Sequence, residues 1–445
     1  MKTILHIDFN SYFATVEQQA NPRLRGKPVG VTGGDRMKRT VLGAASIEAK
    51  KFGVKTGMQI WEARKLCPQI ILVPGDSDKY LEATKRFLGI LKAYGPYLEV
   101  FSIDEVFMEI SFSVIARSAS DEAILIKKDC HALRARNDVV GIAKEIKSRI
   151  KSEIGEWITC SIGISYNKLM AKLAGSLQKP DGLVVIPDHE SAIKILDKVE
   201  LDEICGIGGR IKYRLNKMGI FNFKQLRQIP LEILLISFKS YGNFLYNAAR
   251  GIDESLVMPF YEKEEVKSIG HRHTIDHDTE DPEEIKQILL KLCELVARRL
   301  RSKKLVGKIV SCWFRYSFHL GGGVENPSGA HLPGEHTFHG DGMQTTIQHT
   351  NDGLEIFKAA WRLFEKIWDR REIRMIGVSI SNLNPQTPQN LSFLEENKRK
   401  EIITKALDKI NDKYGEFTLK RAVLLDTPTI RRMPNPFLSD RRFKL

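Results

Sequence analysis

The sequence has no run that could form a membrane helix and no recognisable secretion signal. Its longest apolar runs, such as Ile70–Val73 and Ile233–Ile236, are far shorter than the roughly 20 residues that a spanning helix needs. Asp8 interrupts the N-terminal segment before an apolar signal core could form, and no small-residue cleavage site follows. We therefore expect a globular, cytoplasmic protein with no membrane contact.

Paired cysteines and a phosphate-binding loop are also missing. The six cysteines show no CxxC spacing, which argues against a disulfide framework and a thiolate zinc site. No GxxxxGKS/T sequence occurs, so a P-loop nucleotidase is not indicated. Positive charge, in contrast, is abundant, because 69 Lys and Arg against 55 Asp and Glu give a formal net charge of +14. This charge favours nucleic acid as a partner, although the same residues could merely solvate helices.

The first part of the chain combines strands and helices in a pattern typical of an α+β core. Its length of 445 residues suggests two to four domains. The expected elements are strand 3–9, helix 12–19, helix 78–94, strands 97–102 and 106–110, helix 140–154 and strand 158–164. Acidic residues stand at or near the ends of these strands, where functional side chains commonly gather.

The second part begins with a small all-α module at 201–251, after which a second α+β pattern follows. The expected elements of that pattern are strand 268–275, helix 281–302, strand 307–318, helix 352–369 and strand 373–382. A loop rich in Gly and His, 321–343, interrupts it; His331, His336 and His339 lack ordered ligand spacing, so a structural loop is favoured over a metal site. A helix at 396–413 is expected after an irregular stretch.

Three acids are the candidate catalytic residues. Asp8 ends an apolar strand, while Asp104 and Glu105 lie together between two apolar strands. Burying unpaired charge there would cost several kcal/mol, so a cation must compensate. Carboxylate oxygens suit Mg²⁺, and a pair of such ions supports phosphoryl transfer. The alternative is that each acid caps a turn or pairs with a lysine.

Six segments in order resemble the motifs of Y-family, translesion DNA polymerases. They are Asp8–Glu17, Glu48–Val54, Phe101–Glu105, Gly163–Lys172, Gln178–Gly182 and Gly206–Gly208. The resemblance implies an α+β multidomain fold of the right-hand type. The implied domains are a palm (1–11 and 78–186), fingers (12–77), a helix-hairpin-helix thumb (187–252), a little finger (264–384) and a C-terminal extension (385–445).

The resemblance also implies the reaction. Asp8, Asp104 and Glu105, with the Phe9 carbonyl, would hold two Mg²⁺ ions while deoxynucleoside triphosphates extend a primer on template DNA. The implied enzyme copies with low fidelity, bypasses damage during DNA repair and has no proofreading exonuclease, and we expect it to act as a monomer. A two-metal nuclease and an inactive DNA-binding subunit are the alternatives, although the second should lack one of the acids.

Four further residues are assigned to the incoming nucleotide by the resemblance. Phe13 matches the sugar gate that excludes a ribose 2′-hydroxyl, with a plain core aromatic as the alternative; Tyr12 lies beside it. Lys179 matches a triphosphate-binding lysine. Lys50 replaces the arginine that the family usually has, and Ile47 replaces a tyrosine, so a two-pronged contact becomes a point charge. Short side chains at 41–44 would lie over the nascent base pair.

Two segments are expected to hold macromolecules. Gly206, Ile207 and Gly208 resemble a helix-hairpin-helix turn whose backbone N–H groups approach a DNA phosphate; a simple glycine-rich helix connection is the alternative. Gln389, Leu391 and Phe393 resemble the peptide that docks on a sliding clamp. The competing interpretation of this peptide is the lead-in to an amphipathic helix.

Overall fold

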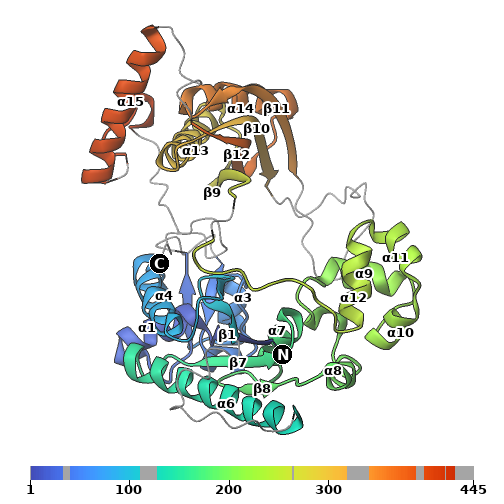
Figure 1. Ribbon diagram of the computed structural model, residues 1–445. Helices are drawn as coiled ribbons and strands as arrows, with labels where there is room; N and C mark the ends of the chain where they lie inside the picture. The colour runs from blue at the N-terminus through green and yellow to red at the C-terminus, as the bar shows by residue number, and fades with distance from the viewer. Residues whose placement is uncertain are drawn as a thin grey trace. The chain divides into compact units, whose positions relative to one another are not determined.

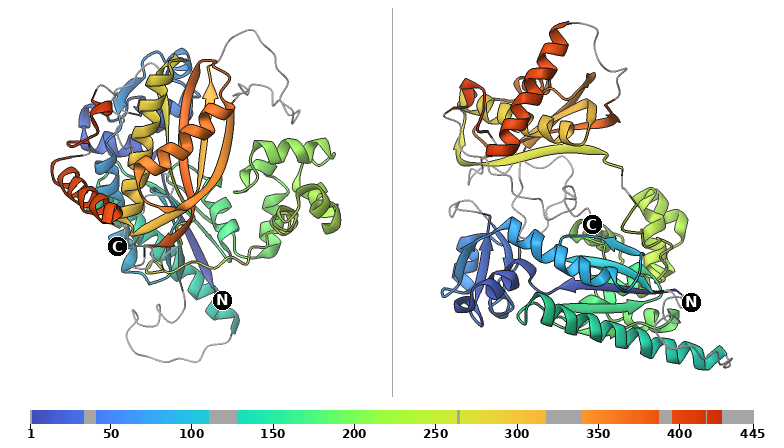
Figure 2. Two further views of the ribbon diagram at one scale, coloured as in Figure 1. Left: turned by 90° about the horizontal axis from the view of Figure 1, so that it is seen from above. Right: turned by 60° about the vertical axis from the view of Figure 1, so that its left-hand side comes forward.

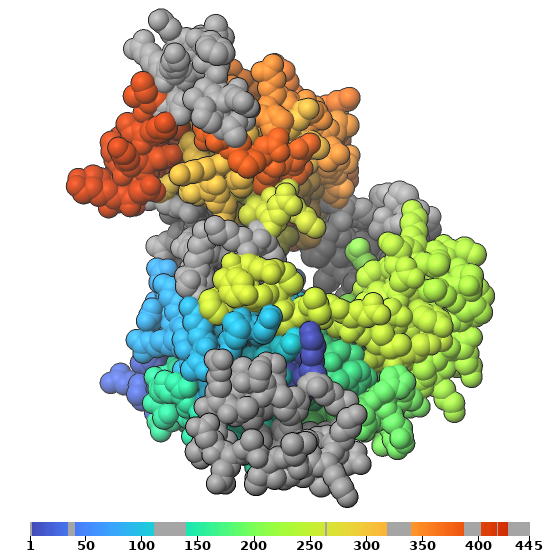
Figure 3. Space-filling model, viewed as in Figure 1, coloured from blue at the N-terminus to red at the C-terminus, as the bar shows by residue number. Residues whose placement is uncertain are grey.

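The computed structural model describes residues 2–33, 41–110, 128–262, 265–317, 340–386, 395–415 and 417–425. Two compact units are present, one formed by the chain up to Lys263 and the other by the chain from Glu264 to Arg432 (Figures 1 and 3). Both units mix helices and sheets, as expected. None of the helices within the described ranges is long and apolar enough to cross a membrane.

A five-stranded sheet forms the centre of the first unit (Figure 1). Its strands are β1 (Thr3–Phe9), β5 (Leu98–Val100), β6 (Glu105–Ile110), β7 (Cys160–Ser165) and β8 (Leu183–Val185). The order is β5-β6-β1-β7-β8, with β1 antiparallel to both β6 and β7. The strands expected at 3–9, 97–102, 106–110 and 158–164 are confirmed within a few residues.

The two faces of this sheet have different cover because side chains alternate along a strand. Leu5, Ile7 and Phe9 point into the core that includes helices α4 (Ser77–Lys92) and α6 (Lys128–Arg149). The other face lies against helix α7 (Lys168–Leu177), which packs on β1 and β7. Gly163 permits this close approach, since a Cβ there would lie 2.1 Å from the Ala171 carbonyl oxygen. The opposite face of β1 therefore carries His6 and Asp8.

Helix α6 differs from its expected extent. The sequence pattern predicts a helix at 140–154, whereas α6 begins at Lys128 and is followed by a π-helical turn, η2 (Ile150–Ile154). The additional residues are more polar than the predicted helix, so apolar periodicity did not mark them.

A smaller three-stranded sheet lies near the N-terminal helix α1 (Tyr12–Ala20). Its strands are β2 (Val29–Thr32), β3 (Leu42–Ala45) and β4 (Ile71–Pro74), in the order β3-β2-β4. Two short helices, α2 (Ile47–Lys51) and α3 (Ile60–Leu66), and a 3-10 turn, η1 (Pro22–Leu24), accompany it. Ser46 caps α2 by accepting a hydrogen bond from the backbone of Ala49.

The all-α module predicted at 201–251 is confirmed. It follows α8 (His189–Leu196) and consists of η3 (Leu201–Glu203), α9 (Gly209–Lys217), α10 (Phe223–Gln228), α11 (Leu231–Phe238) and α12 (Tyr241–Ala249). Its core includes the fully buried Phe223 and also contains Met170 and Leu173 of α7. The module is thus packed directly on the helix that covers the His6 and Asp8 face of the large sheet.

The second unit has the expected β-α-β-β-α-β order (Figure 2). Its elements are β9 (Ser268–Thr279), α13 (Pro282–Ser302), β10 (Leu305–Tyr316), β11 (Gly340–Thr350), α14 (Gly353–Ile367) and β12 (Ile373–Pro385), and the sheet order is β11-β10-β12-β9. Helices α13 and α14 pack together and on these strands. The chain continues into α15 (Glu395–Tyr414) and η5 (Ala422–Leu424).

The prediction of a loop at 321–343 is wrong for its last residues. Gly340 and Gly342 belong to β11, where they pair with Arg315 and Trp313 of β10. A Cβ on Gly340 would lie 2.2 Å from the Phe314 carbonyl oxygen, so this glycine serves close strand packing and not a loop. The predicted loop histidines 331, 336 and 339 lie outside the described residues.

Candidate functional site

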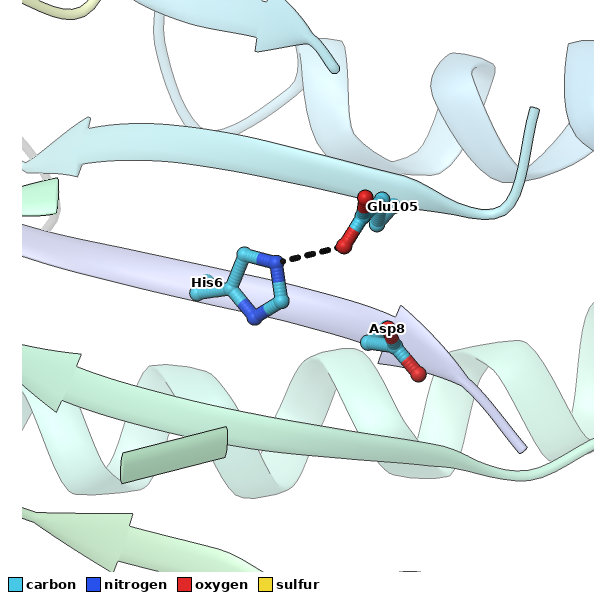
Figure 4. A group of neighbouring side chains, drawn as sticks. All are labelled: His6, Asp8 and Glu105. Atoms are coloured by element: carbon cyan, nitrogen blue, oxygen red, sulfur yellow. Dashed lines mark hydrogen bonds and ion pairs between the residues drawn. The ribbon is translucent and has the colours of Figure 1, made fainter. Parts of the chain in front are cut away.

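Asp8 and Glu105 form a cross-strand pair at one end of the large sheet. They are directly opposite in the β1–β6 register, and both side chains are mostly buried. His6 is on the same face of β1, two residues before Asp8. Donor atoms of His6, Asp8 and Glu105 all lie within 4.8 Å of one another, as Figure 4 shows.

His6 and Lys172 hold the Glu105 carboxylate in its charged form. His6 Nε2 lies 3.1 Å from Glu105 Oε2, and the ammonium of Lys172 on α7 also contacts this oxygen. Burial opposes ionisation of Glu105, but these two partners outweigh it and lower its pKa to about 2. Burial lowers the pKa of His6, so the imidazole is neutral and donates its Nε2 hydrogen to the carboxylate.

Asp104 stands in a different electrostatic environment. Its backbone carbonyl accepts a 3.0 Å hydrogen bond from the Phe9 amide, and its Oδ1 accepts a 2.5 Å hydrogen bond from Ser102 Oγ. Burial, together with the negative charges of Asp8 and Glu105, raises the pKa of Asp104 to about 6. Asp104 is therefore the acid of the three that most needs a nearby positive charge.

Two lysines from distant parts of the chain approach the acids. Lys179 Nζ donates a 2.7 Å hydrogen bond to Asp8 Oδ1. Partial burial and the charge of Lys179 lower the pKa of Lys50, while Asp8 and Asp104 act in the opposite direction. Both predicted phosphate-binding lysines thus lie close enough to the carboxylates to sense their charge.

The ring of Phe13 packs between an aromatic ring and a glycine. It stacks on Tyr80 of α4, with ring centroids 4.3 Å apart and planes 13° apart. On β3, a Cβ built on Gly43 would lie 3.9 Å from Phe13 Cδ2. Tyr80 is itself fixed, because its hydroxyl donates a 2.8 Å hydrogen bond to the buried Glu17, which also pairs with Lys79. Phe13 is consequently held in one position.

The hydroxyl of Tyr12 makes its hydrogen bonds inside the protein. It is 2.7 Å from both the Tyr80 carbonyl oxygen and Thr84 Oγ1, and the tyrosine is buried. Thr84 in turn donates to the carbonyl oxygen of Ile103, next to Asp104. The side chain of Tyr12 therefore connects α1, through Thr84, to the Asp104 turn, and its predicted nucleotide contact stays a prediction.

The glycine turn before α9 has the expected shape. Gly206 has a φ of 105°, a conformation that glycine adopts readily, and its carbonyl oxygen accepts a hydrogen bond from the Tyr241 hydroxyl. Ile207 is buried, and Gly208 is the N-cap residue of α9. The turn thus presents the N-terminus of a helix whose basic residues include Arg210 and Lys212.

Comparison with known proteins identifies the family. Residues 7–176 match the impB/mucB/samB family, residues 266–393 match the C-terminal domain of that family, and residues 202–253 match the thumb domain of DNA polymerase-iota. DNA polymerase IV of Moorella thermoacetica is 35% identical over 95% of this chain and 96% of its own length. DNA polymerase IV of Pelotomaculum thermopropionicum is also 35% identical, over 96% of this chain and 97% of its own. The chain belongs to the Y family of DNA polymerases.

A solved structure agrees with this family assignment. The Y-family DNA polymerase chimera of Dbh and Dpo4 superposes with a TM-score of 0.66 at 23% identity, covering 86% of this chain and 99% of the chimera. The right-hand polymerase fold predicted from the sequence motifs is thereby confirmed.

The donor set of this Y-family site fits the metal on which such polymerases depend. Asp8, Asp104 and Glu105 offer oxygen donors, which hard divalent cations prefer. Within the described part of the chain, no ion pair joins Asp104 to a Lys or Arg, and burial together with the charges of Asp8 and Glu105 raises the pKa of Asp104. A metal ion beside Asp104 would supply a positive charge.

Sequence reasoning missed three residues of the site: His6, Ser102 and Lys172. The alternation of side chains in strand 3–9 places His6 on the face of Asp8, so that signal was available. Lys172 is the last residue of the family motif Gly163–Lys172, but the spacing of that motif does not reveal that Lys172 pairs with Glu105. Gln389, Leu391 and Phe393 lie outside the described residues, and their predicted role stays a prediction.

Proposed function

We propose that this Y-family protein is a template-directed DNA polymerase that uses Asp8, Asp104 and Glu105 for two-metal phosphoryl transfer during low-fidelity, translesion synthesis. One observation carries the assignment to these residues: Asp8 and Glu105 face each other at the ends of β1 and β6, and Asp104, which directly precedes β6, is affected by the charges of both. Lys179 Nζ lies 2.7 Å from Asp8. The DNA polymerase IV relatives that span nearly the whole chain support the reaction.

In this proposal the acids hold the metal ions, and Lys179 and Lys50 bind the triphosphate. Two bound Mg²⁺ ions would activate the attacking hydroxyl and stabilise the leaving oxygen of the transfer. Asp8, Asp104 and Glu105, with the Phe9 carbonyl, are the residues that would hold them. His6 and Lys172 keep Glu105 ionised, which preserves a strong oxygen ligand. Lys179 and Lys50 present positive charge to a triphosphate.

The sugar of the incoming nucleotide is selected by Phe13 in this proposal. The stacked ring of Tyr80 prevents Phe13 from moving aside, so a 2′-hydroxyl would meet a fixed aromatic edge. Gly43 keeps the facing surface of β3 flat, which leaves room for the base. Short side chains on this strand are consistent with a tolerant active site, which distorted templates need.

The parts of the fold receive the names that the resemblance implies. The five-stranded sheet and its helices form the palm, the three-stranded sheet the fingers and α9–α12 the thumb. The second unit is the little finger, followed by the C-terminal extension. The turn at Gly206–Gly208 would hold a DNA phosphate through backbone N–H groups. Such contacts bind DNA without regard to sequence and weaken as salt rises.

The proposed enzyme works as a cytoplasmic monomer without a proofreading exonuclease. Two alternatives remain testable, a nuclease that uses the same acids and an inactive DNA-binding subunit. A single primer-extension assay, with intact and abasic templates and each deoxynucleotide, separates them. Extension identifies the polymerase, shortening of the primer identifies the nuclease, and binding without either product identifies the inactive subunit.

The variant Asp104→Ala tests the metal site directly. We expect it to lose nearly all extension activity in Mg²⁺, because positioning and charge neutralisation provide most of the catalysis. Asp76→Ala is a matched control, since the Asp76 side chain caps α4 by accepting hydrogen bonds from the backbone of Asp78 and Lys79 and is not among the proposed metal ligands. Substantial extension by Asp104→Ala would refute the assignment.

Docking on the sliding clamp is proposed for Gln389, Leu391 and Phe393 because a glutamine followed by apolar anchors suits a hydrophobic groove. The double variant Gln389→Ala, Phe393→Ala should lose stimulation by the clamp and keep its clamp-independent extension. Equal stimulation of variant and parent would favour the helix lead-in.

A further inference from the structure

The turn that carries Lys179 is tightly constrained. It connects the end of α7 to β8 through residues 178–182. Asp181 has a φ of 59°, and a Cβ on Gly182 would lie 1.8 Å from the Gln178 carbonyl oxygen. The backbone therefore folds back on itself, and small displacements of the turn would move Lys179.

Lys147 of α6 donates hydrogen bonds to this turn and to the start of β7. Its Nζ donates to the carbonyl oxygens of Cys160 at 3.0 Å, Asp181 at 2.5 Å and Gly182 at 3.1 Å. It also forms a 2.9 Å ion pair with Asp181 Oδ1. An ammonium group has three N–H donors, so the three carbonyls match its full capacity. The side chain is only 15% exposed, which identifies this lysine as an internal cross-link.

The same turn is fixed to the end of β1 by a second connection. The Gly182 amide lies 3.4 Å from Ser161 Oγ, which donates a 2.9 Å hydrogen bond to Asn10 Oδ1. Asn10 is buried and lies two residues beyond Asp8. Lys147, β7 and the end of β1 thus set the position of the turn relative to Asp8.

We propose that Lys147 is a positioning residue that places the Lys179 ammonium for the triphosphate of the incoming nucleotide. The proposal rests on the proposed function, because it assumes that Lys179 binds that triphosphate. In this proposal Lys147 itself would contact neither substrate nor metal. It acts by holding the backbone of Asp181 and Gly182, two and three residues after Lys179. Misplacement of a binding group by about 1 Å can reduce a rate by about a hundredfold.

A double-mutant cycle tests this inference. Lys147→Met removes the charge and keeps much of the side-chain volume, and Lys179→Met removes the proposed ligand. We expect each single variant to raise the KM for deoxynucleotide by about tenfold or more. If Lys147 acts through Lys179, the double variant will be no worse than Lys179→Met alone, because that ligand is already gone. Affinity for primer–template DNA should stay unchanged in all three proteins.

Lys151→Met is the matched control. Lys151 lies in η2, directly after α6, and pairs with Asp181 Oδ2 at 3.0 Å, but it is more exposed than Lys147 and, among the contacts of the described residues, makes no hydrogen bond to a backbone carbonyl of the turn. Its KM should match that of the parent. Lys147→Arg keeps the charge and several donors, so it should recover part of the lost affinity. If Lys147→Met does not fold, Lys147→Gln, which keeps two N–H donors, replaces it in the cycle.

The outcomes are distinct. The role of Lys147 would be overturned if the KM increases of the two single variants multiply in the double variant. It would also be overturned by a parental KM in a folded Lys147→Met or Lys147→Gln protein. A parental KM in Lys179→Met would instead remove the triphosphate role of Lys179, and the inference would fall with it. A raised KM in Lys179→Met, together with an effect of Lys147 that vanishes in the double variant, supports the inference.

Discussion

Removing the aromatic ring of Phe13 should weaken discrimination against ribonucleotides. The ring stacks on Tyr80, with centroids 4.3 Å apart, and lies near Gly43, where an added Cβ would be 3.9 Å from Phe13 Cδ2. Tyr80 cannot easily yield, because its hydroxyl bonds to Glu17. The 2′-hydroxyl of a ribonucleotide would therefore crowd the Phe13 ring, and such overpacking costs about 1–3 kcal/mol. That energy corresponds to roughly tenfold to a hundredfold in kcat/KM.

The assay is single-nucleotide primer extension with matched deoxynucleotide and ribonucleotide. Phe13→Ala should reduce the ratio of the two kcat/KM values by about tenfold to a hundredfold, mainly through faster ribonucleotide insertion. Phe87→Leu is a suitable control, since Phe87 is buried in the same core and contacts Phe9 but not the predicted sugar position. It should lower stability and leave the ratio unchanged.

Parental sugar selectivity in a folded Phe13→Ala protein would refute this reasoning. An equal loss in Phe87→Leu would show that core packing, and not the ring at position 13, controls the ratio.

Two further predictions concern other parts of the chain. Gly182→Ala should lower the melting temperature and the affinity for deoxynucleotide, because its Cβ would lie 1.8 Å from the Gln178 carbonyl oxygen. Calorimetry compares its melting temperature with that of Gly89→Ala on α4, whose Cβ would meet no atom within 4 Å. Equal melting temperatures of the two variants would contradict the prediction. Arg301→Met should weaken the attachment of α15, because Arg301 makes two hydrogen bonds to Asp408, at 2.6 and 2.8 Å. Amide hydrogen exchange in 402–414 should accelerate by about tenfold, corresponding to about 1.4 kcal/mol. Unchanged exchange would show that packing alone holds the helix.

Local sequence patterns determined much of the fold. The apolar run before Asp8 predicted β1, and the order of later elements predicted both α+β regions and the helical module between them. These predictions succeeded because strand alternation and helical periodicity are properties of neighbouring residues. The positions at strand ends indicated the three acids as metal ligands, and the family motifs added the reaction. The start of α6 and the extent of β11 were less accessible, since polar helix turns and strand glycines give weak local signals.

The tertiary structure alone decided how the site residues interact. Glu105 meets His6 and Lys172 because β6 pairs with β1 and α7 crosses the same face, contacts between residues far apart in the chain. The inward hydroxyl of Tyr12 and the carbonyl contacts of Lys147 depend in the same way on distant partners. Sequence therefore determined which acids are present, while packing determined that His6 and Lys172 keep Glu105 ionised and that burial beside Asp8 and Glu105 raises the pKa of Asp104.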